Sequence, residues 1–279
     1  MFNIVEGLSY PTVSIRKVSA PLWWNFPKMI GANVFIKPNL VSPRSSWDKS
    51  STTNVRVMEM IVEWVIQAGA SHIIIGDCGF KDQWAATIKS TGYDELPKKY
   101  PVKLVPLQDG ENFHKFTLKR LDKYRSLFGA KFSDYMLAAD VVINVPKMKV
   151  HCMAGVTGAI KNMMGTMTQK GNMHPRASVK ILHERLADLY ALTTPMVKFT
   201  IMDGVMGSEY AEQCGHSIHS GVLLSGTDQW EIDVAAAKLM GFDPNDVPYL
   251  RYIRNDFDTV VVPAHLIKQY ERPLSWKNK

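Results

Sequence analysis

The 279-residue sequence has few cysteines and no long hydrophobic run. Its three cysteines, Cys78, Cys152 and Cys214, cannot all pair with one another, so reduced thiols or metal ligands are expected instead of a disulfide framework. No stretch approaches the roughly 18 consecutive apolar residues of a membrane span. The first residues, MFNIVEGLSYPTV, lack the basic start and apolar stretch of a signal peptide. We therefore expect a cytoplasmic protein with no membrane segment.

Charged residues are also scarce, at 21% of the chain, although the formal net charge is +7. Nucleic-acid-binding proteins usually have a long basic run or a recognised reading motif, and neither occurs here. The basic residues outside the central segment have few aromatic neighbours: Lys98, Lys99, Lys119, Arg120, Lys123, Arg125 and Lys131. This pattern predicts at most weak, salt-dependent binding of nucleic acid. The positive charge is either ordinary surface charge or a sign of a small anionic ligand.

The chain also lacks internal repeats and any linker rich in serine or glycine. With 46% hydrophobic residues it can bury a substantial core. We expect one compact unit over residues 1–279, with any division into two lobes falling near residue 145, as about 1–145 and 146–279.

Apolar runs alternate with segments of helical periodicity. One such segment places Met58, Ile61, Val62 and Val65 at helical spacing before Gly69. The expected strands are VFIKPNL (34–40), HIIIGD (72–77), VKLVPL (102–107), DVVINVP (140–146), KFTIMDGV (198–205) and HSGVLLSG (219–226). Alternation of this kind predicts an α/β fold with a mostly parallel sheet flanked by helices.

Polar side chains stand at the ends of the expected strands. They are Lys37 and Asn39, Asp77 and Cys78, Asn144 and Lys147, and Asp203. Open parallel sheets bind ligands outside the carboxyl ends of their strands, so these residues are expected to line one crevice. Each taken alone has a simpler explanation, because an aspartate can cap the next helix and a lysine can be solvated.

The segment KMKVHCMAGVTGAIKNMMG (147–165) follows the strand DVVINVP directly and is rich in lysine and glycine. Glycines let backbone amides approach an anion closely, and a helix beginning near Ala159 would direct its N-terminal dipole at the same point. We expect Gly155, Thr157 and Gly158 to bind an anion, with Lys161 adding a full charge. The spacing matches neither a Walker loop nor a G-x-G-x-x-G turn, so a nucleotide site is weakly supported.

Six segments resemble the domain-of-unknown-function 362 family. They follow one another in order over about three quarters of the chain: IKPNLV (36–41), GD (76–77), ADVVINVPKMKVH (139–151), VTGAIKNMMG (156–165), MDGV (202–205) and IDVAAAKLMG (232–241). Some members of that family carry an additional ferredoxin-like segment with C-x-x-C-x-x-C clusters. The present sequence has no such cluster, so we expect no built-in ferredoxin.

A fainter likeness extends to lactate racemase and its relatives, which show H-x-x-x-G-x-x-G-x-x-K-x-x-x-G. His151, Gly155, Gly158, Lys161 and Gly165 fit that string. In those enzymes the lysine tethers a nickel pincer cofactor and the histidine moves protons, so the resemblance implies these roles for Lys161 and His151. The other metal-binding and substrate residues of those enzymes have no match here, which makes the nickel cofactor a minor alternative.

The cysteines suggest a second kind of site, because all three are expected in loops that face the crevice. Three thiolates can hold an iron-sulfur cluster with an open iron, or a divalent metal such as zinc with His151, His174 or His216 completing the shell. The spacings of 74 residues (152 − 78) and 62 residues (214 − 152) match no compact metal motif. Free cysteine is also often buried for packing alone, so both explanations stay open.

Taken together, the sequence predicts an enzyme that acts on a small anionic substrate, a carboxylate or a phosphate. Lys37, Lys147 and Lys161 would neutralise the anion, and His151 would transfer a proton while Asp77 or Asp203 orients it or binds a metal. Proton transfer or isomerisation and metal-assisted redox chemistry both remain compatible with these groups. The alternative is a non-catalytic iron-sulfur redox or scaffold protein, and nucleic-acid binding is a weaker one.

Overall fold

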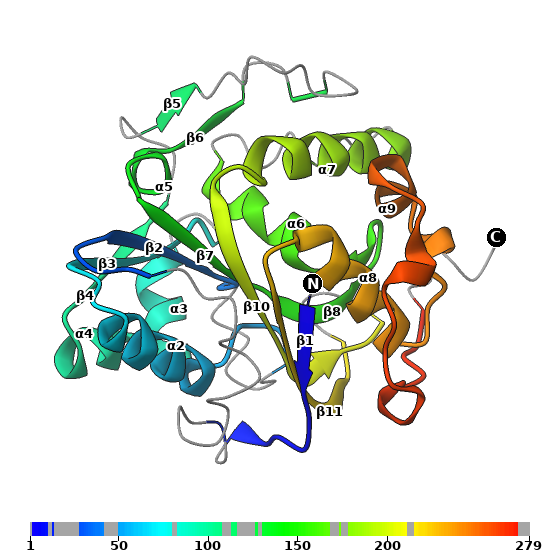
Figure 1. Ribbon diagram of the computed structural model, residues 1–279, viewed down its shortest axis with the longest axis horizontal. Coiled ribbons are helices and arrows are strands. Elements are labelled where there is room, and N and C mark those ends of the chain that lie inside the picture. The colour runs from blue at the N-terminus through cyan, green and yellow to red at the C-terminus, as the bar shows by residue number, and fades with distance from the viewer. Residues whose placement is uncertain are drawn as a thin grey trace.

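The computed structural model describes residues 2–10, 13, 28–41, 50–79, 83–107, 113–115, 126–127, 130–167, 173, 178–210 and 215–272. A nine-stranded sheet runs through the molecule in the order β1-β11-β10-β7-β2-β3-β4, with β8 beside β10 and β9 beside β8 (Figure 1). The sheet is open, because β1 and β4 stand at its two ends.

Five adjacent strands of this order pair in parallel with one another. They are β2 (Asn33–Pro38), β3 (His72–Asp77), β4 (Val102–Pro106), β7 (Val141–Val145) and β10 (Val197–Ser208). Two antiparallel strands, β11 (Ser217–Gly226) and β1 (Phe2–Val5), extend it beyond β10. The predicted α/β fold with a mostly parallel sheet is confirmed.

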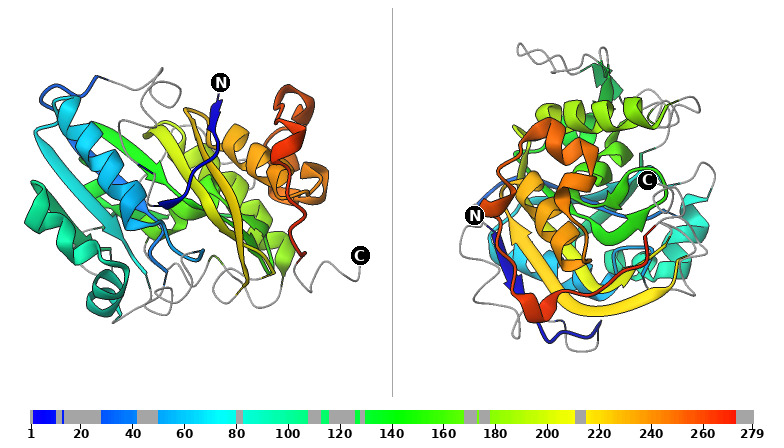
Figure 2. Two further views of the ribbon diagram at one scale, coloured as in Figure 1. Left: turned by 90° about the horizontal axis from the view of Figure 1, so that it is seen from below. Right: turned by 90° about the vertical axis from the view of Figure 1, so that its right-hand side faces the viewer.

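Both faces of the sheet are covered by helices (Figure 1, Figure 2). Val34 and Ile36 of β2 pack in one apolar cluster with α2 (Val55–Gln67). Phe35, which points to the opposite face, packs in a second cluster with α6, α7 and α8. These helices span Ala159–Asn162, Val179–Thr193 and Gln229–Leu239. Burial on both faces explains why the central strands read as continuous apolar runs.

Helix α2 illustrates how local sequence sets the boundaries. Asn54 caps its first turn by accepting a hydrogen bond from the Arg56 amide at 2.9 Å. Gly69 follows the helix with a φ of 88°, a left-handed conformation that glycine adopts without strain. Among the described residues, no helix is both long and apolar enough to cross a membrane.

The glycine-rich segment begins at the carboxyl end of β7. The chain passes through Pro146, whose carbonyl accepts the Asp203 amide at 2.9 Å, into β8 (Lys147–His151). Strand β8 runs parallel to β10 and then turns back into β9 (Gly155–Thr157). The lobe boundary expected near residue 145 therefore falls between two strands of one sheet.

The other elements are short. Strands β5 (Phe113–Lys115) and β6 (Lys131–Ser133) form a separate two-stranded sheet near α7 (Figure 1). The further helices are α3 (Trp84–Thr91), η3 (Tyr93–Glu95), α4 (Leu96–Lys99), α5 (Asp134–Leu137), η4 (Met163–Thr166), η6 (Pro244–Asp246), α9 (Pro248–Ile253), η7 (Phe257–Thr259) and η8 (Ala264–Leu266).

Candidate functional site

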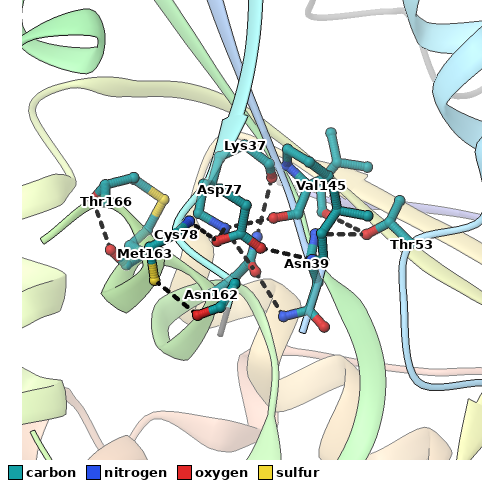
Figure 3. A network of polar contacts seen from close by, with 12 residues as sticks. Lys37, Asn39, Thr53, Asp77, Cys78, Val145, Asn162, Met163 and Thr166 are labelled. Carbon is teal, nitrogen blue, oxygen red and sulfur yellow. Dashed lines mark hydrogen bonds and ion pairs between the residues drawn. The ribbon is translucent and has the colours of Figure 1, made fainter. Parts of the chain in front are cut away.

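Lys37 and Asp77 form a buried ion pair at the carboxyl ends of β2 and β3 (Figure 3). The Lys37 ammonium lies 2.8 Å from Asp77 Oδ1, and their side chains are 0% and 6% exposed. The Asp77 carboxylate also accepts the amides of Leu40 and Cys78, at 2.6 and 2.7 Å. Removing one partner of such a pair costs about 3–5 kcal/mol, because the other charge is left buried.

Asn162 of α6 ties this pair to the rest of the site. Its Oδ1 accepts from Asn39 Nδ2 at 3.0 Å and from the Lys37 ammonium at 3.4 Å (Figure 3). Its Nδ2 donates to the Lys37 carbonyl at 3.1 Å and to Asn144 Oδ1 at 2.8 Å. One buried amide thus fixes α6 against both β2 and β7.

Lys147 and Asp203 form a second buried pair, 2.8 Å apart, with both side chains fully buried. They are direct neighbours in the pairing of β8 with β10. Tyr10 donates to Asp203 Oδ2 at 3.4 Å and accepts a hydrogen bond from the Lys147 ammonium. The Asn54 amide also donates to Asp203 Oδ2, at 2.9 Å, which brings the start of α2 to the same place.

Thr53 and Tyr93 lie between the two ion pairs. The Thr53 hydroxyl accepts the Asn39 amide at 2.9 Å and donates to the Val145 carbonyl at 2.7 Å, and Tyr93 donates to the Thr53 carbonyl. Burial raises the pKa of Tyr93 well above its ordinary value, and the carboxylates of Asp203 and Asp77 raise it further. Both aspartates therefore act on the same buried hydroxyl.

A third lysine, Lys149, joins the site two residues beyond Lys147. It is 1% exposed, and its ammonium donates to Asn39 Oδ1 at 2.9 Å and to the Ser51 carbonyl at 2.8 Å. Alternate residues of a strand share a face, so Lys147, Lys149 and His151 project from one face of β8. Lys149 is not among the site residues expected from the sequence, although alternation in KMKVH points to it once that segment is interpreted as a strand.

His151 is held by the turn that follows it. Its Nδ1 accepts the amides of Met153 and Ala154, at 3.0 and 3.1 Å, and its side chain is buried. Gly155 closes the turn with a φ of 80°, which favours glycine. Two hydrogen bonds that orient this ring therefore come from its own turn. An orienting role for Asp77 or Asp203 stays a prediction.

The first amides of α6 bind a carboxylate that belongs to the protein. Asp233 of α8 accepts from the Ala159 amide, from the Ile160 amide at 3.2 Å and from the Tyr249 hydroxyl at 3.0 Å. A Cβ at Gly158 would overlap that carboxylate. Burial raises the pKa of Asp233 to about 7, against the opposing effect of these hydrogen bonds. The sequence analysis did not identify Asp233, which lies outside the glycine-rich segment.

Lys161 is part-buried on α6, and that helix packs on the same side of the sheet as Met148 and Val150. These two residues alternate with Lys149 and His151 along β8, so their side chains point to the opposite face. The structure thus places α6, which carries Lys161, on the side of β8 away from the His151 side chain. Lys147, Lys149, His151 and Thr157 share the other side.

The cysteines and histidines proposed as metal ligands are only partly described. Cys78 is buried after β3 and Cys152 is exposed in the β8–β9 turn. His174 and Cys214 lie outside the described residues. Within the described ranges, no group of three or more histidine, cysteine, aspartate or glutamate side chains is arranged to hold a metal ion. An iron-sulfur cluster or divalent metal stays a prediction.

Residues 34–238 match the sequence model of a protein family described as "Domain of unknown function (DUF362)". This range contains both ion pairs, β8, β9, α6 and Asp233, whereas Tyr10 and Tyr249 lie outside it. A thylakoid-associated protein of Synechocystis sp., sll1697, is 25% identical over 242 residues, covering 84% of this chain and 71% of that protein. The cytoplasmic location of this chain stays a prediction.

A solved structure, the lactate racemase apoprotein from Thermoanaerobacterium thermosaccharolyticum, is similar with a TM-score of 0.48 and 12% sequence identity. The match covers 72% of this chain and 47% of that one, so this chain spans about half the length of that protein. This likeness is too distant to bear on the activity of the chain.

Proposed function

The chain belongs to the DUF362 family, and we propose that it is an enzyme acting on a small anionic substrate, a carboxylate or a phosphate. The substrate would bind where the β8 side chains meet the carboxyl edge of the sheet. One observation carries the proposal: Lys147 and Lys149, both buried, project from the same face of β8 as His151.

The formal charges of the buried groups favour an anion. Lys37, Lys147 and Lys149 bring three positive charges, while Asp77 and Asp203 bring two negative ones, so these five residues together carry one positive charge. Ammonium groups bind anions more strongly where water is excluded, because the effective dielectric constant is low. A small anion therefore fits this site better than a neutral ligand.

Of the two reaction types that the sequence leaves open, we favour proton transfer or isomerisation. Removal of a proton from carbon next to a carboxylate or carbonyl group develops negative charge on an oxygen, and fixed ammonium groups stabilise that charge. Lys147 and Lys149 would supply this stabilisation without a metal. Metal-assisted redox chemistry is the second option, and it depends on Cys78, Cys152, Cys214 and His174.

Ligand binding can be tested by thermal unfolding with inorganic phosphate, lactate and malate as probes. An anion at a hundredfold excess over its Kd stabilises the folded state by about 2.7 kcal/mol, which raises Tm by several degrees. The anion should not raise Tm of Lys149→Met. It should raise Tm of Lys103→Met, which removes an exposed lysine of β4, as much as that of the wild type. The proposal fails if none of the anions raises Tm of the wild type, or if Lys149→Met responds as the wild type does.

Catalysis is tested separately on the carboxylate that binds, because inorganic phosphate has no carbon-bound proton. Incubation of lactate or malate with the protein in D2O should place deuterium at the carbon that loses its proton, as observed by NMR. Lys149→Met should abolish the exchange. An anion that binds without exchange or turnover would make the protein a binding protein instead of an enzyme.

A further inference from the structure

A continuous chain of hydrogen bonds connects Lys149 to the start of α8 through four buried side-chain amides. These four residues, which we call the amide chain, are Asn39, Asn162, Asn144 and Gln229. Lys149 Nζ donates to Asn39 Oδ1 at 2.9 Å. Asn39 Nδ2 in turn donates to Asn162 Oδ1 at 3.0 Å (Figure 3). The chain continues from Asn162 Nδ2 to Asn144 Oδ1 at 2.8 Å, and from Asn144 Nδ2 to Gln229 Oε1 at 3.1 Å.

Fixed partners decide which way these amides point. Lys149 ends in an ammonium group, which donates hydrogen bonds and accepts none, so the first amide turns its oxygen toward it. Asn162 Nδ2 donates to the Lys37 carbonyl at 3.1 Å, and a carbonyl oxygen only accepts. Asn144 Nδ2 likewise donates to the Ala159 carbonyl, at 2.8 Å. Every amide of the chain therefore directs its oxygen toward Lys149 and its nitrogen away from it.

This orientation stabilises positive charge at the lysine end of the amide chain. The oxygen is the negative end of an amide dipole, and hydrogen bonds in a chain polarise one another where the dielectric constant is low. Asn162 Oδ1 also accepts from the Lys37 ammonium at 3.4 Å, so the same chain acts on a second lysine. Lys37 and Lys149 are 0% and 1% exposed, and a buried charge is costly unless it is hydrogen-bonded. The amide chain contributes to that compensation for both lysines.

We propose that Asn39 and Asn162 are positioning residues, which hold the ammonium groups of Lys149 and Lys37 in place as cations for the anionic substrate. This inference rests on the proposed function and refines it, because it names side chains that set the positive charge of the site by acting through its lysines. The role requires the charge of the two lysines and no unused hydrogen-bond donor on either.

Binding is tested with Asn162→Leu, which removes the amide and keeps a branched side chain. By isothermal titration calorimetry with phosphate and with lactate, this variant should bind at least about tenfold more weakly than the wild type, because the acceptor of Lys37 and Asn39 is lost. Val150→Ala controls for lost stability, because it empties a buried apolar position on the opposite face of β8 from Lys149. It should bind as the wild type does. If Asn162→Leu does not fold, Asn162→Ser leaves room for water and should weaken binding in the same direction.

The direction of the amide chain is tested without a ligand, by NMR of the side-chain NH2 groups. Lys149→Met removes the charge, so each amide becomes a weaker donor and its NH2 protons should shift upfield. The shifts should decrease along the chain, in the order Asn39, Asn162, Asn144. Lys103→Met, which removes an exposed lysine of β4, should leave these signals unchanged. Signals that stay unchanged beyond Asn39 in Lys149→Met would refute the polarised chain.

The outcomes of these measurements separate the two proposals. If the wild type binds no probe, the proposed function fails and the positioning role fails with it. If the wild type binds but the folded Asn162 variant binds equally well, only the positioning role is refuted. A similar weakening of binding in Val150→Ala would also refute it, because lost stability alone would then explain the result.

Discussion

Replacing Asp233 with asparagine should change how the stability of the protein depends on pH. Asp233 is fully buried, and burial raises its pKa from the ordinary 3.8 to about 7, although the amides of Ala159 and Ile160 and the Tyr249 hydroxyl act in the opposite direction. Asparagine resembles the protonated carboxyl group, because its oxygen can accept the Ala159 amide while its nitrogen donates to Tyr249. It does not ionise near neutral pH.

The direction in which stability changes with pH follows from the number of protons that the folded and the unfolded state bind. Between about pH 4 and 7 the folded protein keeps a proton on Asp233 that the unfolded chain has lost. The stability that Asp233 contributes is therefore fully present below about pH 4 and is lost as the pH rises through about 7. Each unit of pKa corresponds to about 1.4 kcal/mol, so the loss over this range is about 4 kcal/mol.

Urea denaturation at intervals between pH 4 and pH 8.5 measures this effect. The unfolding free energy of the wild type minus that of Asp233→Asn should fall by about 1.4 kcal/mol per pH unit and level off above about pH 7. Tyr249→Phe keeps the Asp233 carboxylate but removes a hydrogen-bond donor that lowers its pKa. In this variant the stability contributed by Asp233 should therefore continue to fall at higher pH than in the wild type. A difference that stays constant or rises with pH would refute the reasoning, because the α6 amides would then dominate over burial.

Two glycine substitutions test close approaches in the same region by chemical denaturation. Gly158→Ala places a methyl group against the Asp233 carboxylate and should lower the unfolding free energy by about 1–3 kcal/mol or more. In an Asp233→Ala background the same substitution should cost less, because the carboxylate is absent. Equal losses in both backgrounds would contradict this contact. Gly165→Ala would bring its Cβ 2.6 Å from Lys37 Cε and 2.7 Å from Nζ, and against Asp77 Oδ1. Breaking that buried pair should lower the unfolding free energy by about 3–5 kcal/mol, and an unchanged value would show that the pair can move aside.

The sequence by itself determined the fold class and one edge of the site. Strands buried on both faces must be apolar at nearly every position, so the runs at 34–40, 72–77 and 140–146 were recognisable without any tertiary information. The polar residues that interrupt these runs, Lys37 and Asp77 among them, were identifiable for the same reason. Parallel strands deliver such residues to a common edge, and Lys37 and Asp77 form an ion pair there.

Only the tertiary structure decided which groups meet. Asp233 accepts a hydrogen bond from the Ala159 amide of α6, although the two residues are 74 positions apart in the sequence. Tyr10 donates to Asp203 over a separation of 193 positions. Contacts over such separations depend on the order of strands and on which helix covers which face, and local periodicity encodes neither. The face to which each β8 side chain points also depends on the tertiary structure, because a glycine-rich segment can form a loop or a hairpin. Once β8 pairs with β10, the strand period places Lys149 and His151 on one side of the sheet, whereas α6, which carries Lys161, covers the other side.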